Sequence, residues 1–278
     1  MIVIPFIKMH GLGNDFVVID GRETPFGISS NAAKSIGDRR TGVGCDQILI
    51  LKPVSDDLAD AYMEIWNADG SIARACGNGA RCVAALLMSK TNRSSAIIET
   101  AAGLVHADSG DDGMITVDMG QASSEWTDIP LSEERDTLHL GIENGPLSDP
   151  VGVNIGNPHA VFFVEDADAI DIEVMGPIFE NHPLFPDRAN IEIVSVLEPN
   201  RLRMRVWERG GGLTRACGSG ACAAAVAGHR RGLTGRRIEV VLDGGLMSVE
   251  WLDNGHVLMT GPAVSVYNGE LDSALFYD

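Results

Sequence analysis

The chain has 278 residues, of which 45% are apolar and 22% charged, and its 21 Lys and Arg against 39 Asp and Glu give a formal net charge of −18. This length exceeds what one hydrophobic core normally fills, so two domains are expected. The negative charge argues against nucleic acid or an anionic membrane as a partner, because both bind basic surfaces. An acidic surface that maintains solubility is the simplest interpretation.

Two kinds of segment are missing from the sequence. No apolar run approaches the roughly 18 residues of a membrane-spanning helix. Residues 1–8 have no basic stretch ahead of their apolar run, so they predict a strand rather than a signal peptide. Five cysteines, an odd number, in a chain this long argue against a disulfide framework. We therefore expect a cytoplasmic protein with reduced thiols.

Short β-rich runs dominate the predicted elements. Many of them alternate apolar and polar residues, which is typical of a sheet with one buried face. In chain order the expected strands include 1–8, 15–20, 47–51, 113–118, 201–207, 237–242 and 256–260. Helical patterns are fewer, at about 29–40, 77–90, 171–182 and 218–231. Much strand and little helix predict an α+β fold.

An internal repeat organises the chain. The segment 74–80 recurs 141 residues later as 215–221, with a cysteine at the same place in each copy. Two further pairs of positions lie 143 residues apart: Gly13-Asn14 with Gly156-Asn157, and Gln47 with Asn190. Motifs repeated in one order at nearly one offset predict two similar halves. We expect the boundary in the turn-rich stretch 119–150, and a cleft between the halves where the repeated motifs meet.

Each repeat places a cysteine, Cys76 or Cys217, directly before a helical pattern. The unpaired N–H groups and the dipole at a helix start stabilise negative charge. A thiol there can therefore have a lowered pKa and act as a base. The N–H groups that follow it, of Gly77-Asn78 and Gly218-Ser219, can also bind a carboxylate.

Two such cysteines on opposite sides of one carbon would suit a reaction that inverts a stereocentre. One thiolate removes a proton from one face while the other thiol delivers a proton to the opposite face. Helix N-termini aimed at the α-carboxylate would stabilise the carbanion that forms in between. The residues thus predict a cofactor-independent amino-acid epimerase with Cys76 and Cys217 as its acid/base pair.

Other interpretations of the cysteines fit the sequence less well. A lone cysteine is usually a small core residue, as we expect for Cys45, Cys82 and Cys222. Neither cysteine motif has the C-x₂-C spacing of a zinc ribbon, so no metal site is expected. Gly-x-Gly alone does not make a phosphate loop, and the full lysine-containing motif is absent.

Further polar residues accompany the cysteine motifs. His159 follows the repeated Asn157 and could orient a thiol. Glu208-Arg209 enters a glycine turn before the second motif, although a surface ion pair would look the same. Amides stand at five predicted strand–loop junctions: Asn14, Gln47, Asn67, Asn157 and Asn190. They are ordinary turn residues on the simplest view, but amides bind both ammonium and carboxylate groups and so suit a zwitterionic substrate.

These motifs resemble those of the diaminopimelate epimerase family over nearly the whole chain. The matching segments are 8–16, 42–47, 67–71, 76–82, 156–159, 208–210 and 216–222. The resemblance implies two pseudo-symmetric domains, each a mixed β-sheet wrapped around a central helix. We expect the first domain to comprise 1–118 plus 264–278 and the second 119–263, with the active site in the cleft between them.

The resemblance also implies the reaction, which interconverts LL- and meso-diaminopimelate in lysine and peptidoglycan-precursor synthesis without pyridoxal phosphate, another cofactor or a metal. The implied catalytic residues are Cys76, Cys217, His159 and Glu208. The implied substrate-binding residues are Asn14, Gln47, Asn67, Gly77, Asn78, Asn157, Asn190, Glu208, Arg209, Gly218 and Ser219. Arg209 would hold the distal carboxylate in a bidentate pair. The expected partner is this small molecule, and the family is compatible with a homodimer.

The sequence departs from the family pattern at Ala73–Ala75 and at Leu213, which affects loop packing rather than residues with an assigned role. A proline or hydroxyproline racemase shares the two-cysteine plan but has His where Asn78 stands. An isomerase of the phenazine-biosynthesis type lacks the cysteine pair. A non-catalytic amino-acid-binding protein would use the same carboxylate cradle without proton transfer, and it would show no deuterium exchange at Cα.

Overall fold

The computed structural model describes residues 3–23, 27–55, 57–110 and 112–272. The chain forms two compact units, unit 1 (Met1–Val117 with Gly261–Asp278) and unit 2 (Asp118–Thr260). The unit edges differ from the expected ones by a few residues. Asp118 falls in unit 2, where its carboxylate lies 2.8 Å from Nδ1 of His256. Gly261 and Pro262 fall in unit 1, where the Pro262 carbonyl accepts a hydrogen bond from Arg81.

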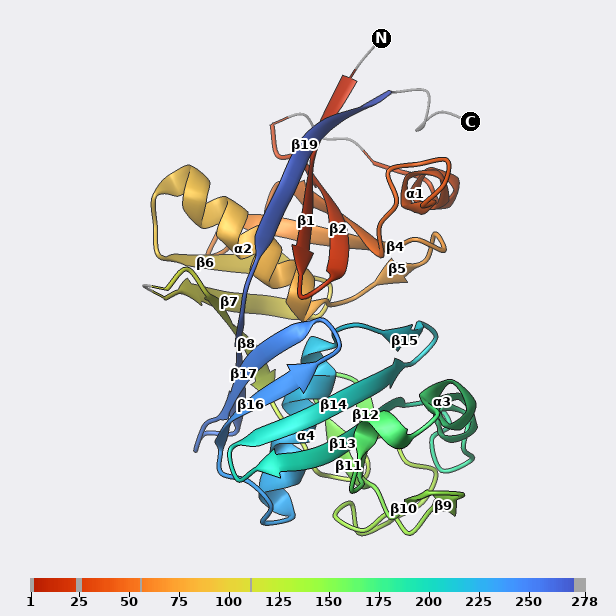
Figure 1. Ribbon diagram of the computed structural model, residues 1–278. Coiled ribbons are helices and arrows are strands. Elements are labelled where there is room, and N and C mark those ends of the chain that lie inside the picture. Colours follow the sequence, from red (N-terminus) through yellow and green to blue (C-terminus); the bar gives the residue numbers. More distant parts are fainter. Residues whose placement is uncertain (1–2, 24–26, 56, 111, 273–278) are drawn as a thin grey trace. The chain divides into compact units, whose positions relative to one another are not determined.

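Unit 1 wraps a mixed sheet around the helix α2 (Figure 1). Its elements are β1 (Val3–Gly11), β2 (Asn14–Asp20), α1 (Ser30–Gly37), β3 (Gln47–Lys52), β4 (Ala61–Asn67), β5 (Ile72–Ala73), α2 (Gly77–Thr91), β6 (Ser95–Thr100), β7 (Gly103–Ser109), most of β8 (Ile115–Gln121 in full) and β19 (Val264–Asp272). β2 runs parallel to β3 and β4 runs parallel to β6, whereas β3–β4 and β6–β7 are antiparallel. β1 lies antiparallel between β2 and β19.

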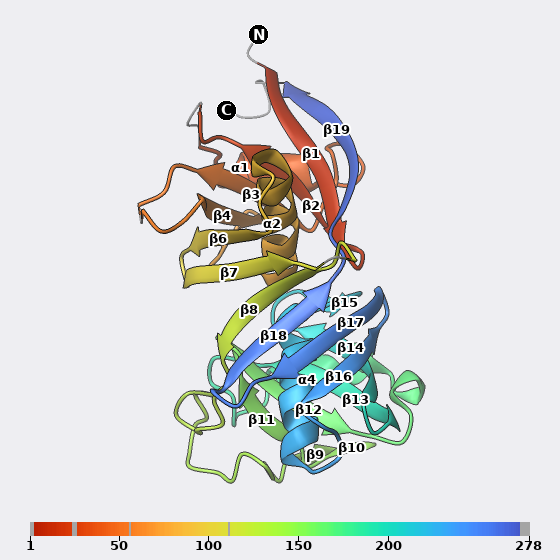
Figure 2. The same cartoon turned by 90° about the vertical axis from the view of Figure 1, so that its left-hand side faces the viewer.

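Unit 2 has the same plan around α4 (Figure 2). Its elements are β9 (Glu143–Asn144), β10 (Leu147–Ser148), β11 (Val151–Asn154), β12 (Pro158–Phe163), a 3₁₀ turn η1 (Ala167–Ala169), α3 (Ile172–Glu180), β13 (Asn190–Glu198), β14 (Arg201–Glu208), β15 (Gly212–Thr214), α4 (Gly218–Arg230), β16 (Arg237–Leu242), β17 (Gly245–Trp251) and β18 (His256–Gly261). The pairs β12–β13 and β14–β16 are parallel, and β11–β12, β13–β14 and β16–β17 are antiparallel.

The repeat in the sequence is therefore also a repeat of strand pairing. In unit 1 Phe16 of β2 lies opposite Gln47 of β3, and in unit 2 His159 of β12 lies opposite Asn190 of β13. These partners are 143 residues apart along the chain, the offset of the repeated motifs. The α+β prediction, with much strand and few helices, is confirmed.

The central helix of each unit is buried on nearly all sides. In α4 every residue from Ala221 to Ala227 is at most 1% exposed, and five of these seven are alanines. A helix that is apolar all round is typical of a fully buried one, and small side chains let the strands pack close to it. No helix among the described residues is long and apolar enough to span a membrane.

Candidate active site

Cys76 occupies the N-cap of α2. Its backbone is extended, with φ −154° and ψ 107°, and its Sγ accepts a hydrogen bond from the N–H of Gly79 at 3.3 Å. Its carbonyl accepts the first intrahelical bond, from Ala80. The sulfur thus stands where a Ser or Asp oxygen usually caps a helix. The half-buried thiol is fixed at the positive end of the helix dipole.

Cys217 occupies the equivalent place on α4. Its Sγ accepts from the N–H of Gly220 at 3.4 Å and lies 3.5 Å from the hydroxyl of Ser219. This cysteine is only 5% exposed. The helix starts predicted for both cysteines agree with the structure, and no disulfide joins any of the five cysteines, all of which lie in the described part of the chain.

The expectation of a lowered thiol pKa is wrong for Cys217. Burial raises its pKa well above the ordinary value, and the negative charges of Glu208 and Glu192 raise it further. The Ser219 hydroxyl and the Gly220 N–H act in the opposite direction, but they are outweighed. A helix start stabilises a thiolate only when burial and nearby carboxylates do not cancel the effect.

The third residue of each helix has no room for a side chain. A Cβ on Gly79 would lie 3.1 Å from a methyl group of Leu49 and 3.4 Å from the Cys76 sulfur. A Cβ on Gly220 would lie 2.9 Å from Oε1 of Glu192 and 3.4 Å from the Cys217 sulfur. Glycine at this place therefore lets each sulfur reach the backbone N–H that it caps.

The remaining N–H groups of each first turn form the predicted carboxylate cradle. The third and fourth N–H groups are used by the cysteine sulfur and the cysteine carbonyl. Those of Gly77 and Asn78, and of Gly218 and Ser219, have no partner within their helices, as in any α-helix. They lie beside the sulfur, where the helix dipole favours an anion.

Asn14 in unit 1 is held from two sides. Its Oδ1 accepts from the side chain of Asn78 at 3.1 Å, and its Nδ2 donates to Asp46 at 2.9 Å. Asp46 also accepts from the backbone N–H of Asp15 at 3.0 Å. This asparagine, the second residue of α2 and the β2–β3 edge are thereby joined.

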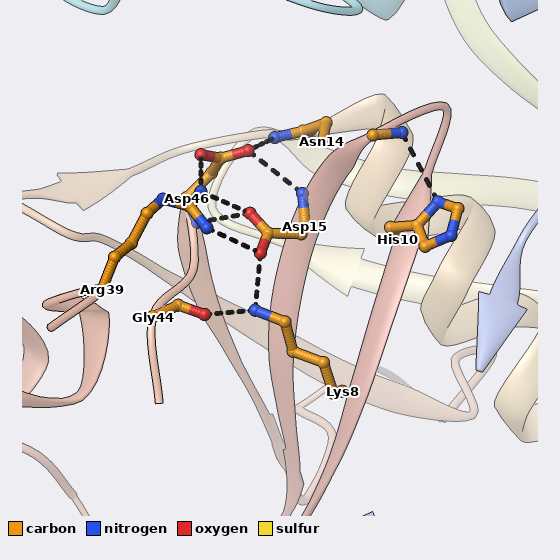
Figure 3. A network of polar contacts seen from close by, with 8 residues as sticks. Lys8, His10, Asn14, Asp15, Arg39, Gly44 and Asp46 are labelled. Atoms are coloured by element: carbon orange, nitrogen blue, oxygen red, sulfur yellow. Dashed lines mark hydrogen bonds and ion pairs between the residues drawn. The ribbon is translucent and has the colours of Figure 1, made fainter. Parts of the chain in front are cut away.

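A cluster of charges supports this arrangement (Figure 3). Arg39 donates to both Asp15 and Asp46, at 2.7 Å each, and Lys8 donates to Asp15 at 2.6 Å. Burial acts to raise the pKa of Asp15, but the hydrogen bonds from Arg39 and Lys8 outweigh it and hold the pKa at about 2. We call Lys8, Asp15, Arg39 and Asp46 the charge cluster. Sequence reasoning gave its members no role, because they meet only through long-range contacts.

Gln47 and Asn67 form a second pair in unit 1. They lie opposite each other on β3 and β4, and Gln47 donates to the Asn67 side-chain oxygen at 2.9 Å. Asn67 in turn donates to Ser71 at 2.9 Å. The Oε1 of Gln47 is buried and accepts no hydrogen bond from the described residues. Such an oxygen calls for a donor, and the ammonium group of an amino acid would supply one.

In unit 2, His159 and Asn157 lie in contact. Nε2 of His159 is 2.9 Å from Oδ1 of Asn157, and Nδ1 is 2.7 Å from Oε1 of Glu192. His159 and Glu192 are both fully buried. The sequence predictions included the histidine and the asparagine but missed the glutamate.

Asn190, Glu208 and Arg209 surround the β14–β15 turn. Asn190 is 3% exposed, donates to the carbonyl of Pro158 at 3.0 Å and accepts from the backbone N–H of Arg209 at 2.9 Å. Both ends of its amide are thus engaged within the protein, and its contact with a ligand stays a prediction. Arg209 is exposed and donates to the carbonyl of Asp187 at 3.1 Å. Glu208 accepts from the hydroxyl of Thr214.

The predicted residues thus form one half-site in each unit. The first half-site is Asn14, Gln47, Asn67, Cys76, Gly77 and Asn78. The second half-site is Asn157, His159, Asn190, Glu208, Arg209, Cys217, Gly218 and Ser219. No group of three or more His, Cys, Asp or Glu side chains placed to hold a metal ion occurs among the described residues.

Comparison with known proteins identifies similar sequences. The family model described as diaminopimelate epimerase matches residues 6–125 and 151–266. The diaminopimelate epimerase of Rhodospirillum centenum is 54% identical over 270 residues, which cover 97% of this chain and 93% of that protein. The diaminopimelate epimerase of Acidiphilium cryptum is 52% identical over 271 residues, which cover 98% of this chain and 97% of that protein.

Solved structures with much lower identity share the fold. A PhzF-family phenazine biosynthesis protein from Bacillus anthracis has a TM-score of 0.70 at 16% identity, covering 98% of this chain and 99% of that one. A hydroxyproline epimerase from Agrobacterium vitis, solved with trans-4-hydroxy-L-proline, has a TM-score of 0.69 at 19% identity, covering 97% and 91%. At such identities the likeness concerns the fold alone.

Proposed function

Because the chain belongs to the diaminopimelate epimerase family, we propose that it interconverts LL- and meso-diaminopimelate, a step of lysine and peptidoglycan-precursor synthesis. The observation that carries the proposal is the pair of cysteines that cap α2 and α4 in the same geometry. The relatives that share about half of the residues over nearly the full chain carry this activity in their names.

The reaction follows from two thiols of opposite protonation. One cysteine, as thiolate, takes the α-proton from one face of the substrate carbon and becomes a thiol. The other, as thiol, gives its proton to the opposite face and becomes the thiolate, and exchange with solvent restores the starting state. The burial and nearby carboxylates that raise the pKa of Cys217 favour its thiol form, so it suits the proton donor.

Stabilisation of the carbanion falls to the helix starts. The N–H groups of Gly77 and Asn78, and those of Gly218 and Ser219, would hold the α-carboxylate as negative charge moves onto its oxygens. Donors fixed by a helix need no reorganisation during the reaction, which is the main advantage of such a site over water. His159 and Glu208 would assist the two thiols.

Recognition of the substrate requires contacts to both of its amino-acid ends. The exposed guanidinium of Arg209 would hold the distal carboxylate, and the buried Oε1 of Gln47 would accept from an ammonium group. A proline-type substrate has no distal carboxylate and would leave Arg209 without a partner in the site. This favours diaminopimelate over hydroxyproline, the ligand of the A. vitis epimerase.

Turnover of LL-diaminopimelate in deuterated water tests substrate and mechanism together. With two bases, the meso product carries solvent deuterium from its first appearance, while the remaining LL substrate stays protonated early in the reaction. Equal early labelling of both would contradict a two-base mechanism. Absence of any turnover or exchange would contradict the proposed activity, and turnover of hydroxyproline instead would favour the racemase alternative. The cytoplasmic location and the homodimer stay predictions.

A further inference from the structure

The most unusual polar contact of unit 2 is the pair His159–Glu192. Both side chains are completely buried, and Nδ1 of His159 lies 2.7 Å from Oε1 of Glu192. The other carboxylate oxygen, Oε2, is also buried and has no hydrogen-bond partner among the described residues. Burying a carboxylate is costly unless a partner compensates it, so a protein keeps such a pair only where it has a use.

The fold itself does not need this pair. Glu192 lies two residues beyond Asn190 on β13, on the same face, just as Leu49 lies two residues beyond Gln47 on β3. The partner of Gln47 is Phe16, and the partner of Asn190 is His159. Phe16 and Leu49 are also fully buried, so unit 1 fills the equivalent space with an apolar pair. Each member of both pairs has the same place beside its central helix, with Leu49 next to Gly79 and Glu192 next to Gly220.

The hydrogen bonds of His159 restrict where its protons lie. Nε2 faces the Oδ1 of Asn157, which can only accept, so Nε2 carries a proton and donates. Nδ1 and Oε1 of Glu192 then share one further proton, whether it sits on the ring or on the carboxyl. Both arrangements leave the pair with no net charge, which suits its complete burial.

The consequence reaches Asn157. Because its Oδ1 accepts from His159, its Nδ2 is directed away from the ring, and that group has no partner among the described residues. Without a donor on Nε2 the amide could turn around and present its oxygen instead. An NH₂ group suits a substrate carboxylate, whereas an oxygen would repel it.

We propose that Glu192 is a positioning residue for the epimerase reaction: through its bond to Nδ1 it holds His159 with a proton on Nε2, so that Asn157 presents its NH₂ group to the substrate carboxylate. This inference rests on the proposed function. Glu192 acts only through His159 and touches no reacting atom.

Three variants test the proposal by a double-mutant cycle. Glu192→Leu together with His159→Phe imports the apolar pair of unit 1, and each single variant completes the cycle. Glu192→Leu alone should reduce kcat/KM about tenfold or more, mainly through KM, because a buried hydrogen bond is lost. In the His159→Phe background the same change should cost at most about twofold, since the residue through which Glu192 acts is gone. Additive losses would overturn the proposal.

Glu192→Gln separates donor geometry from charge. A glutamine amide can donate to Nδ1, leaves the pair neutral and keeps the proton on Nε2. Its kcat/KM should therefore stay within about threefold of the wild type, against the tenfold or greater loss for leucine. A loss as large as that of leucine would overturn the positioning role. Ser195→Ala is the matched control, because Ser195 is a buried polar residue of the same strand that bonds the backbone of Ala167 and not His159.

The ¹⁵N resonances of His159 provide a readout that does not depend on turnover. In the wild type and in Glu192→Gln, Nε2 should carry a bonded proton, and in Glu192→Leu the protonation should become mixed. A wild-type Nε2 without a proton would overturn the proposal even if all kinetic results agreed. If the wild type fails to epimerise diaminopimelate but the resonances are as expected, the proposed function is wrong while the assignment of the positioning pair stands.

Discussion

The first and second half-sites differ in how they hold the same kind of asparagine. In unit 1 Asn14 is held by Asn78 and Asp46, and the charge cluster lies behind it. In unit 2 Asn157 is held by His159, with the neutral pair His159–Glu192 behind it. The position equivalent to Asp46 is Ala189, so unit 2 has no place for the carboxylate that fixes Asn14.

This comparison separates what the fold provides from what the sequence adds. The repeated strand pairing and the Cys–Gly–x–Gly start fix each sulfur in the same way. The neighbours then set its chemistry: Cys217 is buried beside two carboxylates, whereas Cys76 is half-buried on a helix start joined to Asn14 through Asn78. Two related scaffolds can thus supply two unlike thiols, which a reaction with one acid and one base requires.

The largest expected effect comes from removing either sulfur. Cys76→Ala and Cys217→Ala should each lower kcat by about 10²–10⁴-fold, the usual contribution of a general acid or base. Circular dichroism should show an intact fold. Cys222→Ala, on the same helix as Cys217 but in the core, is the control and should keep its activity. Full activity in either of the first two variants would end the two-base mechanism.

The charge cluster should make unit 1 more acid-sensitive than unit 2. The pKa of Asp15 is lowered to about 2 from 3.8, and its side chain is 17% exposed. Its contribution to stability, about 2 kcal/mol, is present above pH 3.8 and lost as the pH falls through 2. Urea unfolding should show Asp15→Asn to be less stable by this amount at pH 7, and the difference should shrink towards pH 2. A difference that does not change with pH would mean that the ion pairs contribute nothing.

Loosening Asn14 should weaken substrate binding without stopping the chemistry. Asp46→Ala imports the residue of unit 2 and removes the acceptor for Nδ2 of Asn14. We expect KM to rise about tenfold with kcat little changed, since one hydrogen bond to a charged group is lost. Steady-state kinetics measures the split, and Asp38→Ala, a helix-end carboxylate that bonds only its own loop, is the control. A kcat effect larger than the KM effect would place Asp46 in the chemical step.

The smallest effect concerns the thiol of Cys217. The charge of Glu208 raises its pKa, so Glu208→Gln should lower that pKa and shift the thiolate to lower pH. The signals of ¹³Cβ-labelled cysteine, followed over pH, would show the shift. Cys45, whose pKa burial raises to about 12, should not move and is the internal control. An unchanged Cys217 would mean that burial alone sets its protonation.

The cysteine positions could be predicted because their motif is local and occurs twice. A glycine-rich segment before a helical pattern places Cys76 and Cys217 at helix starts without any knowledge of the tertiary structure. Strands such as β16 were equally accessible, since 237–242 alternates buried and more exposed residues. Such signals survive because they depend on neighbours a few residues away.

Contacts between distant segments were not accessible in this way. Asp46 reaches Asn14 across 32 residues, and Glu192 reaches His159 across 33. β13 is buried on both faces along its first six residues, so Glu192 carries no periodic sign of where it points. The raised pKa of Cys217 depends on the same long-range approach of Glu192 and Glu208. These features became visible only with the strand register.

Synthesis on the ribosome gives β19 a meaning of its own. Unit 1 takes this strand from the far end of the chain, antiparallel to β1 with Val3 opposite Asp272. Unit 2 has emerged completely before β19 is made, so it can fold first although it is second in sequence. Until β19 arrives, β1 presents an unpaired edge of the kind on which chains aggregate. A chain stopped at Thr260 should therefore show hydrogen-exchange protection in unit 2 but not along β1, and chaperones would have most to do in the final moments of translation.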